Sequence, residues 1–108
     1  MDLDAFQKFS RLVRIAVGDA ELCVPENNVL LRCFQYLEPE KLPFGPWCWN
    51  GECGADRIRW RRAGEPESAD QNGLACLVCV EEGMHVTLLT PELRRALRPV
   101  LEPAPAVR

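Results

Sequence analysis

The spacing of the cysteines constrains this chain more than any other feature of its sequence. Two of the six cysteines form the run Cys48-x4-Cys53, which continues to Asp56. Two more form the pair Cys76-x2-Cys79 further along the chain. In a chain whose thiols stay reduced, such a grouping indicates a metal site, a catalytic group or core packing, and a secreted disulfide scaffold is the weaker alternative.

The first cysteine pair lies in a long loop, which the sequence predicts over residues 38–56 and which is rich in proline and glycine. A loop of this length is unusual inside a compact domain unless it has a function. Gly51 and Gly54 provide the backbone freedom needed to wrap a compact anionic group and aim N–H groups at it. One loop cannot surround such a group, so a further ligand must come from another part of the chain.

The segments around this loop predict a small α+β domain. Three of them show the alternating apolar pattern of half-buried strands: residues 12–17, 21–24 and 57–61. Gly18-Asp19 is a turn dipeptide that joins the first two into a hairpin. An apolar stripe over residues 29–37 predicts a helix packed on the core, with Asn27 or Asn28 as its N-cap.

The last third of the chain predicts a second group of elements. Residues 64–73 form a polar turn, residues 74–80 an apolar β-prone segment and residues 86–89 a final strand. Thr90 and Pro91 predict the N-cap and first position of a short C-terminal helix that ends near Leu97. We therefore expect one domain over residues 1–100, in which a mixed sheet packs on one main helix, and a flexible tail over residues 101–108.

Composition excludes several classes of function. The formal net charge of −3 argues against a nucleic-acid-binding protein. No apolar run approaches the ~18 residues that a membrane-spanning helix needs, so we expect no direct membrane insertion. The acidic start of the chain lacks the basic region of a signal peptide, which leads to the expectation of a cytoplasmic protein.

The cysteine motifs also carry a resemblance to a known family. The run Cys48-Trp-Asn-Gly-Glu-Cys53-Gly-Ala-Asp56, followed by Leu74-Ala75-Cys76, resembles the [2Fe–2S] domain of succinate dehydrogenase and fumarate reductase iron–sulfur subunits. Its spacing matches the plant-type pattern C-x4-C-x2-C followed by a distant cysteine, except that Asp56 stands at the third position. The resemblance covers roughly residues 10–90, with a longer stretch than usual before Cys76. The second half of that family's subunit, with its additional clusters, has no counterpart in this chain.

This resemblance implies a β-grasp fold of the [2Fe–2S] ferredoxin-like type. It implies that Cys48, Cys53, Asp56 and Cys76 hold one [2Fe–2S] cluster, with Asp56 as an oxygen ligand. The implied function is one-electron transfer, by a free ferredoxin or by a small redox subunit of a larger oxidoreductase. The partner would then be a redox protein or an oxidoreductase subunit, and the chain alone would not be an enzyme.

Other interpretations of the same residues remain open. Asp56 could be a turn residue that begins the following strand, in which case Cys79 could be the remaining ligand. Cys48, Cys53, Cys76 and Cys79 could instead hold a structural zinc ion through four thiolates. A domain that has lost its cluster and acts as a non-redox interaction module is a third possibility.

The remaining cysteines and the single histidine have no expected role in the candidate site. Cys33 lies on the apolar stripe of the predicted helix, where a buried packing role is expected. Cys23 has no assigned role. His85 lies on an alternating strand and is expected to point to solvent, and a Rieske site is excluded because it needs two histidines. A group of four arginines is expected to form a solvated face that could meet an acidic partner: Arg57, Arg59, Arg61 and Arg62.

Overall fold

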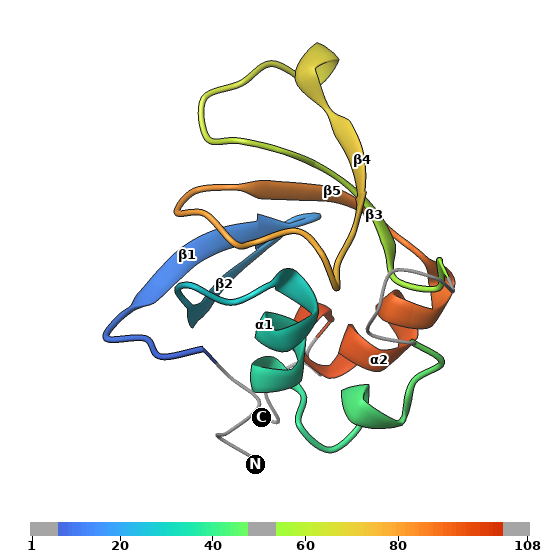
Figure 1. Cartoon of the computed structure of the whole chain (residues 1–108). Coiled ribbons are helices and arrows are strands. Elements are labelled where there is room, and N and C mark those ends of the chain that lie inside the picture. Colours follow the sequence, from blue (N-terminus) through green and yellow to red (C-terminus); the bar gives the residue numbers. More distant parts are fainter. Residues whose placement is uncertain (1–6, 48–53, 103–108) are drawn as a thin grey trace, which may run out of the picture.

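A computed structural model describes residues 7–47 and 54–102 of the chain (Figure 1). In these ranges it contains five strands and two α-helices. The strands are β1 (Leu12–Val17), β2 (Ala20–Pro25), β3 (Arg57–Arg61), β4 (Gln71–Leu74) and β5 (His85–Leu89). The helices are α1 (Leu30–Leu37) and α2 (Pro91–Leu101), and two short 3-10 turns are η2 (Leu42–Phe44) and η3 (Glu67–Ala69).

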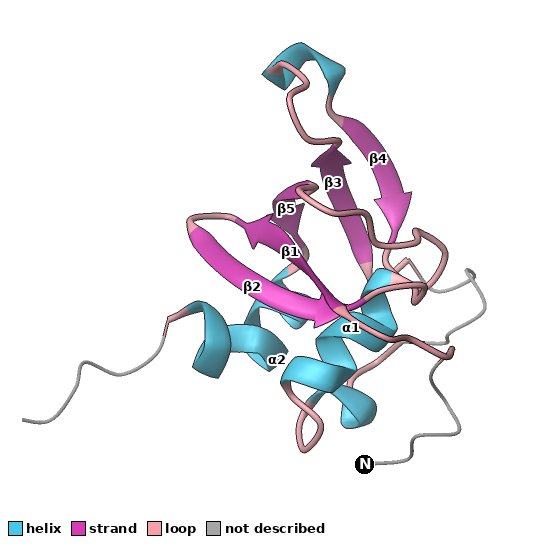
Figure 2. Ribbon diagram, turned by 90° about the vertical axis from the view of Figure 1, so that its left-hand side faces the viewer, coloured by secondary structure: helices cyan, strands magenta, loops and turns pink. Residues whose placement is uncertain are grey.

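The strands form one mixed sheet in the order β2-β1-β5-β3-β4. The β1 and β5 strands are parallel, and the other neighbouring pairs are antiparallel. The two helices lie on the same side of this sheet, whereas the β3–β4 hairpin extends away from them (Figure 2). The expected α+β architecture, with a helix packed on a mixed sheet, is therefore confirmed.

The core lies between the sheet and the two helices. Its largest fully buried apolar side chains come from every layer: Ile15, Leu30, Leu31, Phe34, Ile58, Met84, Leu93 and Leu97. Each such side chain contributes about 1.5–3 kcal/mol of transfer free energy when it leaves water. None of the helices in the described ranges is long and apolar enough to cross a membrane.

The locally encoded elements agree with the sequence analysis. The strands predicted over residues 12–17 and 57–61 are β1 and β3, and Ile58 and Trp60 are buried as the alternation indicated. Gly18 turns the first hairpin with a φ of 59°, a left-handed conformation that glycine adopts without steric cost. Thr90 caps α2 and Pro91 occupies its first turn, as predicted.

Two segments differ from the prediction because pairing with distant residues determines their secondary structure. Residues 71–73, predicted as part of a polar turn, belong to β4 because they pair with β3. Residues 74–80, predicted as a strand, contain one strand residue, followed by a turn in which Leu77 and Val78 donate to the Leu74 carbonyl. Cys79 then makes an isolated bridge to Val29.

The N-cap of α1 and the C-terminal end of α2 also differ from the prediction. The N-cap of α1 is Val29, which makes no side-chain cap hydrogen bond, while the Asn28 amide bonds to the backbone of Gln7 and Glu26. Helix α2 continues through Pro99 to Leu101, beyond the predicted end near Leu97. The missing N–H of Pro99 costs one helical hydrogen bond, but Leu101 still packs on the core.

His85 is half-buried and does not simply point to solvent as expected. Its Nε2–H donates to the Gly18 carbonyl at 3.1 Å, and its Nδ1 lies 3.4 Å from the Arg61 guanidinium. His85 therefore connects β5 to the first hairpin.

Candidate functional site

The candidate site is centred on Asp56 and Cys76, which are 20 residues apart in the sequence. The pairing of β3 with β4 brings them together, because Arg57 is opposite Leu74 at the end of this ladder. Beyond the ladder, the Asp56 carbonyl accepts a hydrogen bond from the Ala75 N–H at 2.9 Å. The Asp56 carboxylate oxygen Oδ2 accepts one from the Cys76 N–H at 2.7 Å. Two predicted ligands thus lie side by side.

Both side chains are removed from solvent. Asp56 is 1% exposed and Cys76 is 7% exposed. The second carboxylate oxygen of Asp56, Oδ1, is also buried and has no hydrogen-bond partner in the described structure. A buried carboxylate oxygen without a donor is costly, so a cation or a metal ion would be stabilised beside this atom. Asp56 also lies in the turn that directly precedes β3, as the alternative interpretation of this residue expected.

The loop that carries Cys76 is fixed by the start of α1. The Leu30 N–H donates to the Val78 carbonyl at 2.8 Å, and the Leu31 N–H donates to the Ala75 carbonyl at 2.9 Å. These are N–H groups of the first helical turn, which have no partner inside a helix. Because these N–H groups bond to the Ala75 and Val78 carbonyls, they hold the backbone on both sides of Cys76.

The segment before Asp56 is fixed by the start of α2. The Thr90 hydroxyl donates to the Ala55 carbonyl at 2.7 Å and accepts from the Leu93 N–H at 3.2 Å. One side chain therefore caps the helix and positions the residue next to Asp56. The Thr90-Pro91 signature predicts the cap, but no sequence pattern indicates the link to Ala55, because that link exists only once the helix lies beside the loop.

The residues that flank the Cys48–Cys53 segment are anchored too. The Trp47 indole is buried, and its Nε1–H donates to the Leu42 carbonyl at 2.6 Å. A side chain at Gly45 would overlap the Trp47 ring, so this close approach requires glycine. After the segment, Gly54 has a φ of 70°, which favours glycine over other residues.

Cys48 and Cys53 themselves lie outside the described residues, and so do Gly51 and Trp49. Within residues 7–47 and 54–102, no group of three or more histidine, cysteine, aspartate or glutamate side chains could hold a metal ion. The described part of the chain therefore supplies two of the four predicted ligands. The assignment of the other two remains a prediction.

The other described cysteines differ in environment. Cys79 and Cys23 are exposed, whereas Cys33 is fully buried on α1 as predicted. Burial, with a smaller contribution from the nearby Cys79 thiol, raises the pKa of the Cys33 thiol to about 12. Its Sγ lies 3.6 Å from the Pro25 carbonyl and 3.8 Å from the Asn28 carbonyl. Cys33 is thus an inert packing residue.

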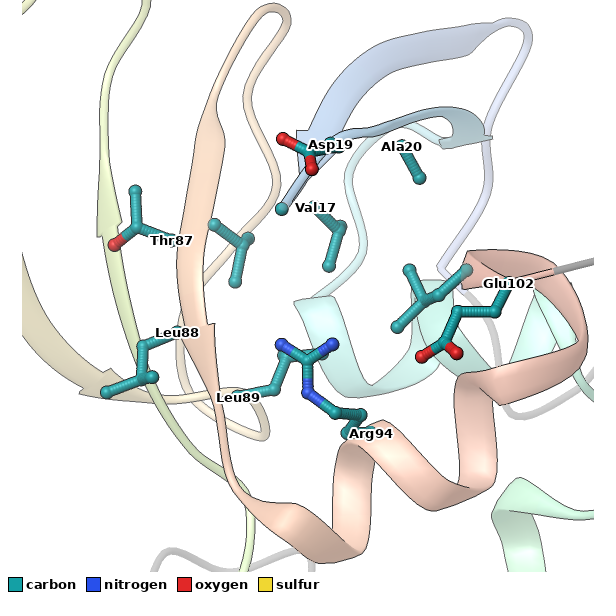
Figure 3. A pocket seen from close by; sticks show the side chains of 11 residues that line it. Val17, Asp19, Ala20, Thr87, Leu88, Leu89, Arg94 and Glu102 are labelled. Carbon is teal, nitrogen blue, oxygen red and sulfur yellow. The ribbon is translucent and has the colours of Figure 1, made fainter.

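A separate pocket of about 270 Å³ lies where the ends of β1 and β5 meet α2. Figure 3 shows the Arg94 guanidinium in this pocket, with the Asp19 and Glu102 carboxylates on its rim. Neither Asp56 nor Cys76 lines it. It therefore does not belong to the candidate site.

Comparison with known proteins adds no family assignment. No protein-family model matches this chain, and a search of curated proteins finds no significant match.

Proposed function

We propose that this chain is a one-electron transfer protein that binds a single [2Fe–2S] cluster through Cys48, Cys53, Asp56 and Cys76. The observation that carries this proposal is the contact between Asp56 and Cys76, together with the buried Oδ1 atom of Asp56, which has no donor in the described part of the chain. The resemblance in motif and spacing nominated these two residues. Their proximity across the sheet, 20 residues apart in sequence, supports the nomination independently.

The donor set fits the proposed group. Cysteine thiolates are the usual ligands of iron–sulfur clusters, and a carboxylate offers a harder oxygen donor in place of one of them. A bound [2Fe–2S] cluster supplies reversible one-electron transfer, with a potential set by ligand identity, net charge, hydrogen bonds and burial. The chain would supply the buried Asp56 oxygen, the Cys76 thiolate, and the backbone held by Leu30, Leu31 and Thr90.

The fold proposed for this function is the β-grasp of [2Fe–2S] ferredoxin-like domains. Three features of the structure support it: the order β2-β1-β5-β3-β4, the parallel β1–β5 pair, and the position of α1 on one face of the sheet. We propose that the protein acts in the cytoplasm with a redox partner protein or a larger oxidoreductase. The chain itself would turn over no substrate.

Purification without oxygen tests this proposal. We expect brown protein with visible absorption that bleaches on reduction with dithionite, and two irons and two sulfides per chain. The reduced protein should give a low-temperature EPR signal from one unpaired electron. Colourless protein with one equivalent of zinc would contradict the proposal, and metal-free protein after failed anaerobic reconstitution would favour a non-redox interaction module.

Cysteine variants provide matched controls. Cys76→Ser should lose most of the iron and colour, because it removes a thiolate that the proposal assigns to the cluster. Cys79→Ser makes the same chemical change three residues later, on an exposed side chain. This variant should retain the iron and the colour. Loss of iron in Cys79→Ser, with iron retained in Cys76→Ser, would mean that Cys79 is the ligand.

A further inference from the structure

An apolar groove flanked by arginines lies beside the candidate site. It occupies about 260 Å³ where the ends of β3 and β5 meet the start of α2. Its rim includes Arg57, Arg59, Asn72, Leu88, Thr90 and Pro91. The β3 and β5 strands are neighbours in the sheet (Figure 1), and Arg59 is directly opposite Leu88 in their ladder.

The charge at this groove is opposite to that of the whole chain. The chain has a net charge of −3, yet Arg57 and Arg59 are exposed and neither has an ion pair with a residue that the structure describes. Among the residues that the structure describes, no aspartate or glutamate lines the groove. In contrast, the next two arginines are neutralised: Arg61 pairs with Asp70 at 3.1 Å and Arg62 with Glu81 at 3.3 Å. A local positive potential therefore remains at the groove.

Leu88 gives the same surface an apolar centre. Its side chain is 54% exposed, at a position of β5 that pairs with β3 and lies beyond the last residue that pairs with β1. A single exposed leucine needs no explanation by itself. Next to an apolar groove and two arginines that have no ion pair within residues 7–47 and 54–102, it forms the combination of apolar centre and charged rim that is typical of transient protein interfaces.

The groove is continuous with the candidate site. Arg57 directly follows Asp56, and it is opposite Leu74, which precedes Cys76 by two residues. Thr90 lines the groove and also bonds to the Ala55 carbonyl. A protein seated on this surface would therefore cover the part of the sheet next to Asp56 and Cys76.

We infer that this groove docks the acidic face of a redox partner protein, and this inference rests on the proposed function. Carboxylates of the partner would pair with Arg57 and Arg59, and one apolar side chain would enter the groove against Leu88. Complementary charge would accelerate and orient the encounter, whereas the apolar contact would slow dissociation.

A labelled peptide tests the recognition chemistry directly. The probe is fluorescein-Asp-Glu-Leu-Phe-Glu-Asp-amide, and a matched probe replaces its four acids by the corresponding amides. We expect the acidic probe to bind, by fluorescence anisotropy at low salt, about tenfold more tightly than the amide probe. Its affinity should fall as salt is added. No saturable binding at millimolar protein would overturn the inference.

Three variants localise the binding. Arg59→Glu should lower the affinity for the acidic probe by about tenfold, and Leu88→Ser should lower it by about threefold. Both residues are exposed, so the fold should persist, and circular dichroism checks this. Arg98→Glu makes the same charge change on an exposed position of α2 outside the groove, and should alter binding less than twofold. Equal losses in Arg59→Glu and Arg98→Glu would show non-specific attraction and overturn the inference.

Two further measurements distinguish this inference from membrane binding and from failure of the proposed function. Phosphatidylserine vesicles that bind in an Arg59-dependent manner, while the peptide does not, would assign the surface to an anionic membrane instead. Binding is measured on the protein before and after removal of its metal. A protein that purifies without metal, fails anaerobic reconstitution and still binds the peptide would refute the cluster and leave the recognition surface. A brown protein that does not bind the peptide would refute only the docking site.

Discussion

The Asp56 carboxylate accepts a hydrogen bond from the backbone N–H of Cys76 at 2.7 Å, across the end of the β3–β4 ladder. This contact uses one carboxylate oxygen and leaves the other buried with no donor among the residues that the structure describes. Oδ2 holds the Cys76 loop, and in the proposed function Oδ1 would be a ligand of the cluster.

Truncation of Asp56 separates these roles. Asp56→Ala removes the acceptor of the Cys76 N–H, and we expect it to lower the free energy of unfolding by about 1–3 kcal/mol. Asp56→Asn keeps an oxygen acceptor and should cost clearly less, although its amide is a poor iron ligand. Urea unfolding of the metal-free variants measures the first effect, and iron content measures the second. Equal destabilisation by both substitutions would argue against the hydrogen bond as the structural role of Asp56.

Asp56→Cys restores the third cysteine of the plant-type spacing. We expect this variant to retain its cluster and to change its reduction potential, because a thiolate replaces an oxygen donor at the iron. Potentiometric titration and EPR spectroscopy, each compared with the unmodified protein, measure the change. If both potential and spectrum are identical to those of the parent, Asp56 is not a ligand.

Thr90 is expected to be important for both the fold and the site. Thr90→Ala removes the α2 cap and the bond to the Ala55 carbonyl, so we expect a loss of about 1–2 kcal/mol in stability. Thr90→Ser retains a hydroxyl that can make both bonds and should stay within about 0.5 kcal/mol of the parent. Thermal and urea unfolding provide the measurements. Similar losses in the serine and alanine variants would show that the hydroxyl is not the stabilising group.

The cysteines should differ sharply in reactivity. The thiolate is the reactive form, and a pKa of about 12 keeps Cys33 protonated at pH 8, so we expect it to resist alkylation in the folded protein. The exposed thiols of Cys23 and Cys79 should react with iodoacetamide within minutes. Peptide mass spectrometry identifies the modified residues, and labelling in guanidinium chloride provides the control in which all three react. Labelling of Cys33 at the rate of Cys79 would contradict its buried position.

Elements with a strong local pattern were predictable from the sequence. Val13, Ile15 and Val17 alternate in β1, and Ile58 and Trp60 alternate in β3, because residues two apart share one face of a strand. The helical stripe of α1 and the Thr90-Pro91 start of α2 are also local signals. In contrast, β4 has the polar sequence Gln71-Asn72-Gly73-Leu74 and becomes a strand only because β3 lies beside it.

The candidate site also combines features that the sequence indicates with features that depend on the tertiary structure. The sequence by itself determined which side chains are candidates, because the spacing and motif of Cys48, Cys53, Asp56 and Cys76 carry the resemblance on which the proposed cluster site rests. Only the tertiary structure decided that Asp56 is buried against the Cys76 N–H with one oxygen unsatisfied, and that Arg59 and Leu88 share a groove beside it. Burial and proximity depend on strand pairing between residues far apart along the chain, and local sequence patterns do not encode such pairing.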